Sequence, residues 1–180
     1  MFDLVITGGT VIDGTGTPGV RADVGVADGR IAAVGDLAGA EAVETVDVTD
    51  KVVCPGFVDP HTHYDAQIFW DPWATPSSLH GVTSLVMGNC GFSLAPIGDE
   101  SDAAYIGAMM VKVEGMSPAA LEIGVDWDWR STADYLDRLD GNIGVNVAAM
   151  VGHCALRRTV MKDDAVGREA TDAEVAEMQH

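Results

Sequence analysis

The chain has 180 residues, of which 47% are hydrophobic, and its 28 acidic against 10 basic residues give a formal net charge of −18. A chain of this length can bury one ordinary hydrophobic core, so disorder is not expected. The negative charge repels phosphate backbones and anionic lipid headgroups, which argues against nucleic-acid and membrane partners.

The opening residues and the cysteines indicate the compartment. The first segment has no basic start followed by a long apolar run, so it predicts no secretory signal, and no apolar stretch is long enough to cross a bilayer. Cys54, Cys90 and Cys154 are odd in number and widely spaced, which does not suit a disulfide framework. We therefore expect a cytoplasmic protein.

The first fifty residues read as short strands joined by tight turns. Asp28-Gly29 is a strong two-residue hairpin signal, and Gly8-Gly9 predicts a turn between two further strands. The predicted strands cover residues 3–7, 10–13, 22–27, 30–34 and 42–48. We interpret residues 1–51 as a segment of a small β domain.

From residue 52 the pattern changes to strands followed by longer helical stretches, which is typical of a parallel α/β domain. The strands are predicted at 56–59, 82–87 and 144–151, and the last two are apolar runs expected of strands buried on both faces. Helices are predicted at 102–112 and 131–139. Residues 52–180 form the second predicted domain.

A capping box formed by Thr171 and Glu174 predicts a helix close to the end of the chain. A domain seldom ends within two or three turns of such a start. We therefore expect the chain to be the front portion of a longer protein, whose carboxyl-terminal remainder would be a partner of these residues.

The segment Phe57-Val58-Asp59-Pro60, which begins with two apolar residues, leads into His61 and His63. In an extended chain residues i and i+2 point to the same side, so both imidazoles could bind one ion. Five histidines in 180 residues would give this spacing by chance about 0.14 times. Cys90 is either a third ligand or a buried small residue, and its own sequence context leaves both readings open.

Each candidate residue lies just beyond the carboxyl end of a predicted strand, with His153 after the third. In a (β/α)₈ barrel this end carries the chemistry. Such a barrel needs about 250 residues, and about 130 follow the β-rich segment, enough for about three βα units. The predicted barrel therefore cannot close within this chain.

The segment 55–63, Pro-Gly-Phe-Val-Asp-Pro-His-Thr-His, resembles the first metal-binding strand of the metal-dependent amidohydrolase superfamily. The opening segments 3–9 and 11–14 are similar to its first β segment. Four further motifs resemble the N-acyl-D-amino-acid deacylases, also called D-aminoacylases: residues 88–93, 113–116, 127–129 and 146–157. The resemblance covers essentially the whole chain.

The resemblance implies a fold and an activity. The family fold is a catalytic (β/α)₈ TIM barrel beside a small composite β-sandwich domain built from both chain ends. The implied reaction is the zinc-dependent hydrolysis of a small-molecule N-acyl-D-amino acid to a carboxylate and a D-amino acid, with one or two Zn²⁺ ions. The general-base aspartate is expected beyond residue 180.

The resemblance also implies roles for particular residues. His61, His63 and Cys90 become metal ligands, with Cys90 in the place that a carboxylated lysine takes in many superfamily members. Lys51, Lys112 and Lys162 lie outside the predicted strand ends, which agrees with that role.

Several residues keep two interpretations. His153 is favoured as a substrate-binding wall residue over a ligand, because it and Cys154 would face opposite ways along a strand. Asp59 and Asp65 could orient an imidazole or simply end a strand. Arg157 and Arg158 could bind a substrate carboxylate or lie at the surface, and they remain unassigned.

There are two competing functions. One is a cyclic-amide hydrolase, such as a hydantoinase or dihydroorotase, and the other is a noncatalytic metal-binding fragment.

Overall fold

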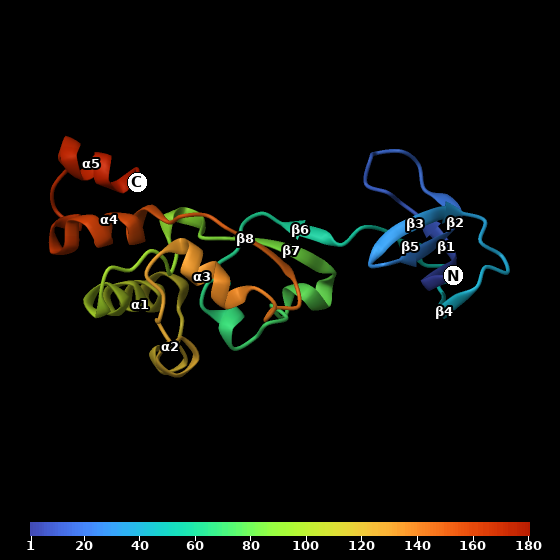
Figure 1. Ribbon diagram of the computed structural model, residues 1–180, viewed down its shortest axis with the longest axis horizontal. Helices are drawn as coiled ribbons and strands as arrows, with labels where there is room; N and C mark the ends of the chain where they lie inside the picture. The colour runs from blue at the N-terminus through green and yellow to red at the C-terminus, as the bar shows by residue number, and fades with distance from the viewer. The chain divides into compact units, whose positions relative to one another are not determined.

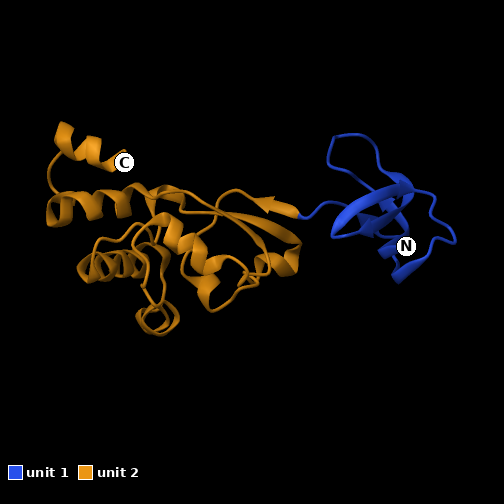
Figure 2. Cartoon of the chain, viewed as in Figure 1, with its two compact units in different colours: residues 1–56 blue, residues 57–180 orange.

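The computed structural model describes residues 1–180 and divides them into two compact units, Met1–Gly56 and Phe57–His180 (Figure 2). The predicted change of organisation at residue 52 lies close to this boundary. The chain is a mixed α/β protein, with strands in both units and all the helices in the second.

The first unit is a five-stranded sheet with β1 at its centre. The order is β3-β2-β1-β4, and β5 also pairs with β1. β1 is antiparallel to β2 and parallel to β4 and β5. The strands are β1 (Phe2–Val11), β2 (Val20–Ala27), β3 (Arg30–Gly35), β4 (Ala42–Asp47) and β5 (Val52–Val53).

Two glycine-containing turns were predicted in this unit, and the structure has one of them. Asp28 and Gly29 have φ values of 51° and 68°, as a two-residue hairpin turn requires, so the predicted β2–β3 hairpin is confirmed. The turn predicted at Gly8-Gly9 is wrong. These residues lie inside β1, where the pairing register with β2 shifts between Ile6 and Gly9, because glycine also marks an irregularity within one strand.

The second unit contains a three-stranded parallel sheet in the order β6-β7-β8 (Figure 1). The strands are β6 (Phe57–Asp59), β7 (Val82–Met87) and β8 (Asn146–Ala149). The helices are α1 (Glu100–Glu114), α2 (Pro118–Gly124), α3 (Thr132–Leu139), α4 (His153–Met161) and α5 (Asp172–Met178). Short 3₁₀ helices lie at Gln67–Phe69, Ser77–His80, Asn89–Gly91 and Lys162–Ala165.

Three of these elements match the sequence patterns closely. β7 has the predicted limits. Ser131 and Thr171 both form full capping boxes, with Asp134 and Glu174, at the starts of α3 and α5. β8 is shorter than predicted, and the prediction that both strands are buried on both faces is wrong. Only Leu85 and Met87 of β7 are buried, and the residues of β8 alternate between exposed and half-buried.

The core of the second unit is organised around Trp129, which is 1% exposed. Its ring stacks on Phe69 at 5.2 Å, meets Tyr135 edge-on at 5.2 Å, and donates from Nε1 to Leu94 O at 2.8 Å. Tyr135 in turn donates to the carbonyl of Asp65 at 2.9 Å. Aromatic packing with satisfied polar atoms therefore fixes the residues just after the two candidate histidines.

A buried ion pair joins α1 to α4. Arg158 Nε donates to Asp102 Oδ1 at 2.9 Å, and the two side chains are only 8% and 0% exposed. Asp102 Oδ2 also accepts from Gly98 N at 3.0 Å and from Lys162 Nζ at 2.5 Å. The guanidinium lies 4.8 Å from the centre of the Tyr105 ring. Arg158 is therefore a structural residue, neither a surface arginine nor one free to meet a substrate carboxylate.

None of the helices has the length and apolar character needed to cross a membrane.

The substitution Arg158→Met should lower the free energy of unfolding by about 3 kcal/mol, because it removes the buried partner of the Asp102 carboxylate and leaves only the half-exposed Lys162 to pair with it. Urea denaturation followed by circular dichroism measures this change. Arg138→Met is the matched control. Arg138 contacts Asp126 and Asp128 at the surface, and losing such pairs costs less than about 1 kcal/mol. Equal losses of unfolding free energy in the two variants would show that the buried ion pair stabilises the fold no more than the surface ion pairs do.

Candidate metal centre

The backbone after β6 directs both histidines to one side. Between them lies Thr62, which is buried; its amide and its hydroxyl both donate to Val86 O, at 3.0 and 2.8 Å. Since Thr62 faces the core, its neighbours His61 and His63 face away from it, as alternation in an extended chain requires. Their ring centres are 5.6 Å apart.

Cys90 lies in a tight turn after β7. Gly88 and Cys90 both have left-handed backbone conformations, with φ values of 76° and 57°. The positive φ of Cys90 is unusual for a residue with a side chain, and strained backbone conformations of this kind are common at functional sites. Between them Asn89 is buried and its amide donates to Val86 O at 2.8 Å and to Thr62 O at 3.2 Å. This amide ties the cysteine turn to the histidine segment.

The structure brings the three predicted ligands together. His61 Nε2 lies 3.2 Å from Cys90 Sγ, and one ligand atom from each of His61, His63 and Cys90 lies within 4.8 Å of the others. His61 and Cys90 are exposed and His63 is half-buried. Two imidazole nitrogens and a sulfur at these separations are a donor set that suits Zn²⁺.

The segment after β8 packs tightly on the cysteine turn. The amide of Gly152 donates to Ser93 Oγ at 3.0 Å. A methyl group on Gly88 would approach Met150 O to 2.1 Å, and one on Gly152 would approach Ser93 Oγ to 2.6 Å. The backbones meet so closely that only glycine fits at either position.

His153 is not among the clustered ligand atoms. It is the exposed first residue of α4, and Cys154 is the second, so the prediction that they alternate along a strand is wrong. The helix begins earlier than the apolar run suggested, with Gly152 as its N-cap. Both residues border Gly91, and partial burial raises the pKa of the Cys154 thiol.

The two aspartates that flank the histidines do not contact an imidazole through a hydrogen bond. Asp59 Oδ1 accepts from the backbone amide of His61 at 3.1 Å, and Asp65 Oδ2 accepts from Gly88 N at 3.2 Å. Burial raises the pKa of Asp65 to about 6, and the nearby Glu114 adds to this rise. Asp65 therefore connects the histidine segment to the cysteine turn.

Glu114 is the site residue that the sequence did not single out. Its Oε1 lies 3.6 Å from His63 Nδ1, and it ends α1, far along the chain from the histidine. The residue was part of the Val113–Met116 motif, but no local spacing signals a contact between segments so distant in sequence.

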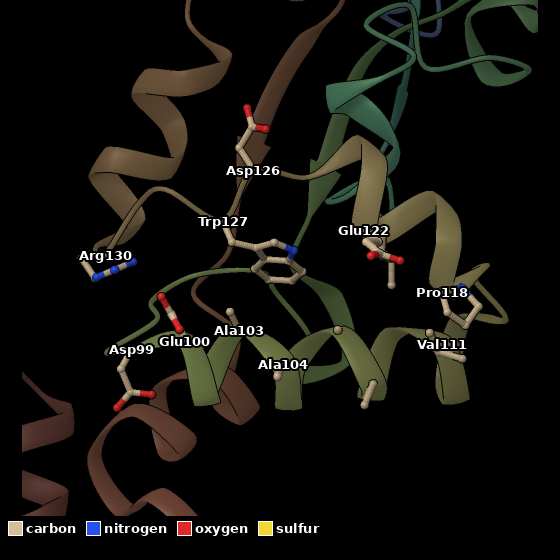
Figure 3. A pocket seen from close by; sticks show the side chains of 13 residues that line it. Asp99, Glu100, Ala103, Ala104, Val111, Pro118, Glu122, Asp126, Trp127 and Arg130 are labelled. Atoms are coloured by element: carbon tan, nitrogen blue, oxygen red, sulfur yellow. The ribbon is translucent and has the colours of Figure 1, made fainter.

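A groove of about 690 Å³ lies between α1, α2 and the segment before α3 (Figure 3). Small residues of α1, including Ala103 and Ala104, line it beneath the Trp127 ring, and Glu100 and Asp126 lie at its edge. None of His61, His63 and Cys90 lines this groove. It is therefore separate from the candidate metal centre.

This chain is similar to known proteins over nearly its whole length. The model of the amidohydrolase family matches residues 44–179. A D-aminoacylase of Alcaligenes xylosoxydans xylosoxydans is 45% identical over 179 residues, which cover 99% of this chain and 34% of that protein. The chain thus spans about a third of the length of the curated relatives it matches.

Two solved structures are similar over the same extent. A D-aminoacylase studied for its binuclear metal centre has a TM-score of 0.83 at 44% identity, covering 99% of this chain and 35% of that one. An N-acyl-D-glutamate deacylase of Bordetella bronchiseptica, in complex with zinc and a phosphonate inhibitor, has a TM-score of 0.79 at 37% identity, with 99% and 35% covered. By the match of the family model over most of its length, the chain belongs to the amidohydrolase family.

Proposed function

We propose that these residues form part of a zinc-dependent enzyme that hydrolyses N-acyl-D-amino acids to a carboxylate and a free D-amino acid. The observation that carries the proposal is the convergence of His61, His63 and Cys90 at the carboxyl ends of β6 and β7. The names of the relatives supply the substrate class.

The proposed fold follows from the same comparisons. β6, β7 and β8 would be the first three strands of a (β/α)₈ barrel, and residues 1–51 a segment of a small β domain beside it. The parallel order β6-β7-β8 supports this, because consecutive barrel strands pair in sequence order.

The donor atoms fit a zinc ion. In tetrahedral zinc sites the Zn–N and Zn–S bonds, about 2.0 and 2.3 Å, place neighbouring donors about 3.5 Å apart. The 3.2 Å between His61 Nε2 and Cys90 Sγ is close to that value. The ligands would bind one or two ions. When bound, zinc would polarise the amide carbonyl and lower the pKa of a bound water toward about 7.

The chain's own residues would hold and border the substrate. His61 and Cys90 are exposed, so one side of the cluster stays open to an acyl group. His153, exposed on the first turn of α4, is proposed as a substrate-binding residue. The general base would be an aspartate outside residues 1–180.

Replacing Cys90 with alanine should abolish stoichiometric zinc binding by the chain. In the product of the full reading frame it should reduce the release of D-methionine from N-acetyl-D-methionine at least about 100-fold, because a ligand of the hydrolytic metal is lost. Zinc content is measured by atomic absorption and turnover with a D-amino acid oxidase assay. Cys54→Ala is the control, because Cys54 is also an exposed free cysteine.

Full zinc content and full turnover in Cys90→Ala would contradict the ligand assignment. Cleavage of hydantoins without cleavage of N-acetyl-D-amino acids would instead favour a cyclic-amide hydrolase. Zinc binding with no hydrolysis of either substrate would leave a noncatalytic metal site.

Zinc should also stabilise the 180-residue chain. A ligand that binds only the folded state at a hundredfold excess over its Kd raises the free energy of unfolding by about 2.7 kcal/mol. Thermal denaturation with and without zinc measures this gain. Magnesium should give none, because it prefers oxygen ligands, and equal shifts with both ions would point to nonspecific binding by the acidic surface.

A further inference from the structure

His63 has a buried ring nitrogen with no hydrogen-bond partner. Its Nδ1 is removed from solvent and accepts or donates no hydrogen bond in the structure. A buried polar group left unpaired destabilises the folded state. The nearest charged atom is Oε1 of Glu114, at 3.6 Å, which is slightly longer than a hydrogen bond.

We propose that Glu114 is the positioning residue of His63: it accepts a hydrogen bond from Nδ1–H and thereby presents Nε2 to the metal. This inference rests on the proposed zinc site. Imidazole ligands commonly donate their second N–H to a carboxylate, which fixes the ring orientation and the tautomer. Contacts of this kind are often long before the site is loaded and shorten afterwards.

The helix that carries Glu114 is well fixed. Ile106 and Met110 of α1 are fully buried, and Gly115 ends the helix with a φ of 66°. Figure 3 shows the amino-terminal and central turns of the same helix beneath Trp127. The Glu114 side chain is only 19% exposed, so its carboxylate is held near His63 by the packing of the whole helix.

The local electrostatics of Glu114 are unfavourable without a cation. A carboxylate in the last turn of a helix interacts unfavourably with the helix dipole. Asp65 is a second carboxyl group close by, and Glu114 raises the pKa of Asp65. An imidazole N–H polarised by a bound cation would offset both effects, which gives this placement a physical reason.

The test compares Glu114→Ala, Glu114→Gln and the control Glu122→Gln in the 180-residue chain. Glu122 is an exposed glutamate of α2, so its replacement removes the same charge without a contact to His63. The first readout is the tautomer of His63 in the metal-free chain, from the ¹⁵N chemical shifts of the ring nitrogens. The second is the zinc Kd, from competition with a chromophoric chelator.

We expect the wild type and Glu122→Gln to hold His63 with its proton on Nδ1. Glu114→Ala should shift the proton toward Nε2 and raise the zinc Kd about 10–100-fold, the range seen when such an outer partner is removed. Glu114→Gln keeps a carbonyl acceptor, so it should retain the Nδ1–H tautomer and lose less affinity than Glu114→Ala. If the alanine variant does not fold, Glu114→Met, which keeps the side-chain length but removes the acceptor, should show the same tautomer shift and loss of zinc affinity.

An unchanged tautomer, or a zinc Kd within about twofold of the wild type in Glu114→Ala, would overturn the inference. The proposed function fails by a different result, namely zinc binding that does not need Cys90 or a full-length protein that releases no D-amino acid. The tautomer is measured without metal or substrate, so the two failures are distinguishable.

Discussion

The carbonyl oxygen of Val86 is the point on which the candidate metal centre depends. It accepts from the amide and hydroxyl of Thr62 and from the side-chain amide of Asn89. These donors belong to the two segments that carry the three candidate ligands. One half-buried acceptor near the end of β7 therefore ties the histidine pair to the Cys90 turn through three hydrogen bonds that need no ion.

Much of this site could be predicted from the sequence because its signals are local. The alternation around Thr62 explains the common direction of His61 and His63, and the apolar run of β7 places Cys90 at the same sheet edge. The hairpin at Asp28-Gly29 and the capping boxes at Ser131 and Thr171 are likewise properties of a few neighbouring residues. In each case the residues that produce the feature are close to one another in the sequence.

The features that the sequence did not reveal depend on distant partners. Arg158 is buried because Asp102, 56 residues away, accepts its hydrogen bond. Glu114 lies close to His63 because the packing of Ile106 and Met110 positions α1. Gly8-Gly9 has the composition of a turn, and only pairing on both sides of β1 makes it part of a strand. Such outcomes are decided by tertiary packing.

The close contacts at Gly88 and Gly152 determine which positions of this site can accept a different side chain. A methyl group at either position would overlap Met150 O or Ser93 Oγ, so neither position accepts a side chain. His61 and Cys90 project to the exposed side, where a different side chain displaces no core atom. Substitutions at His61 or Cys90 would thus change the donor atoms offered to a metal ion, while the supporting backbone stays the same.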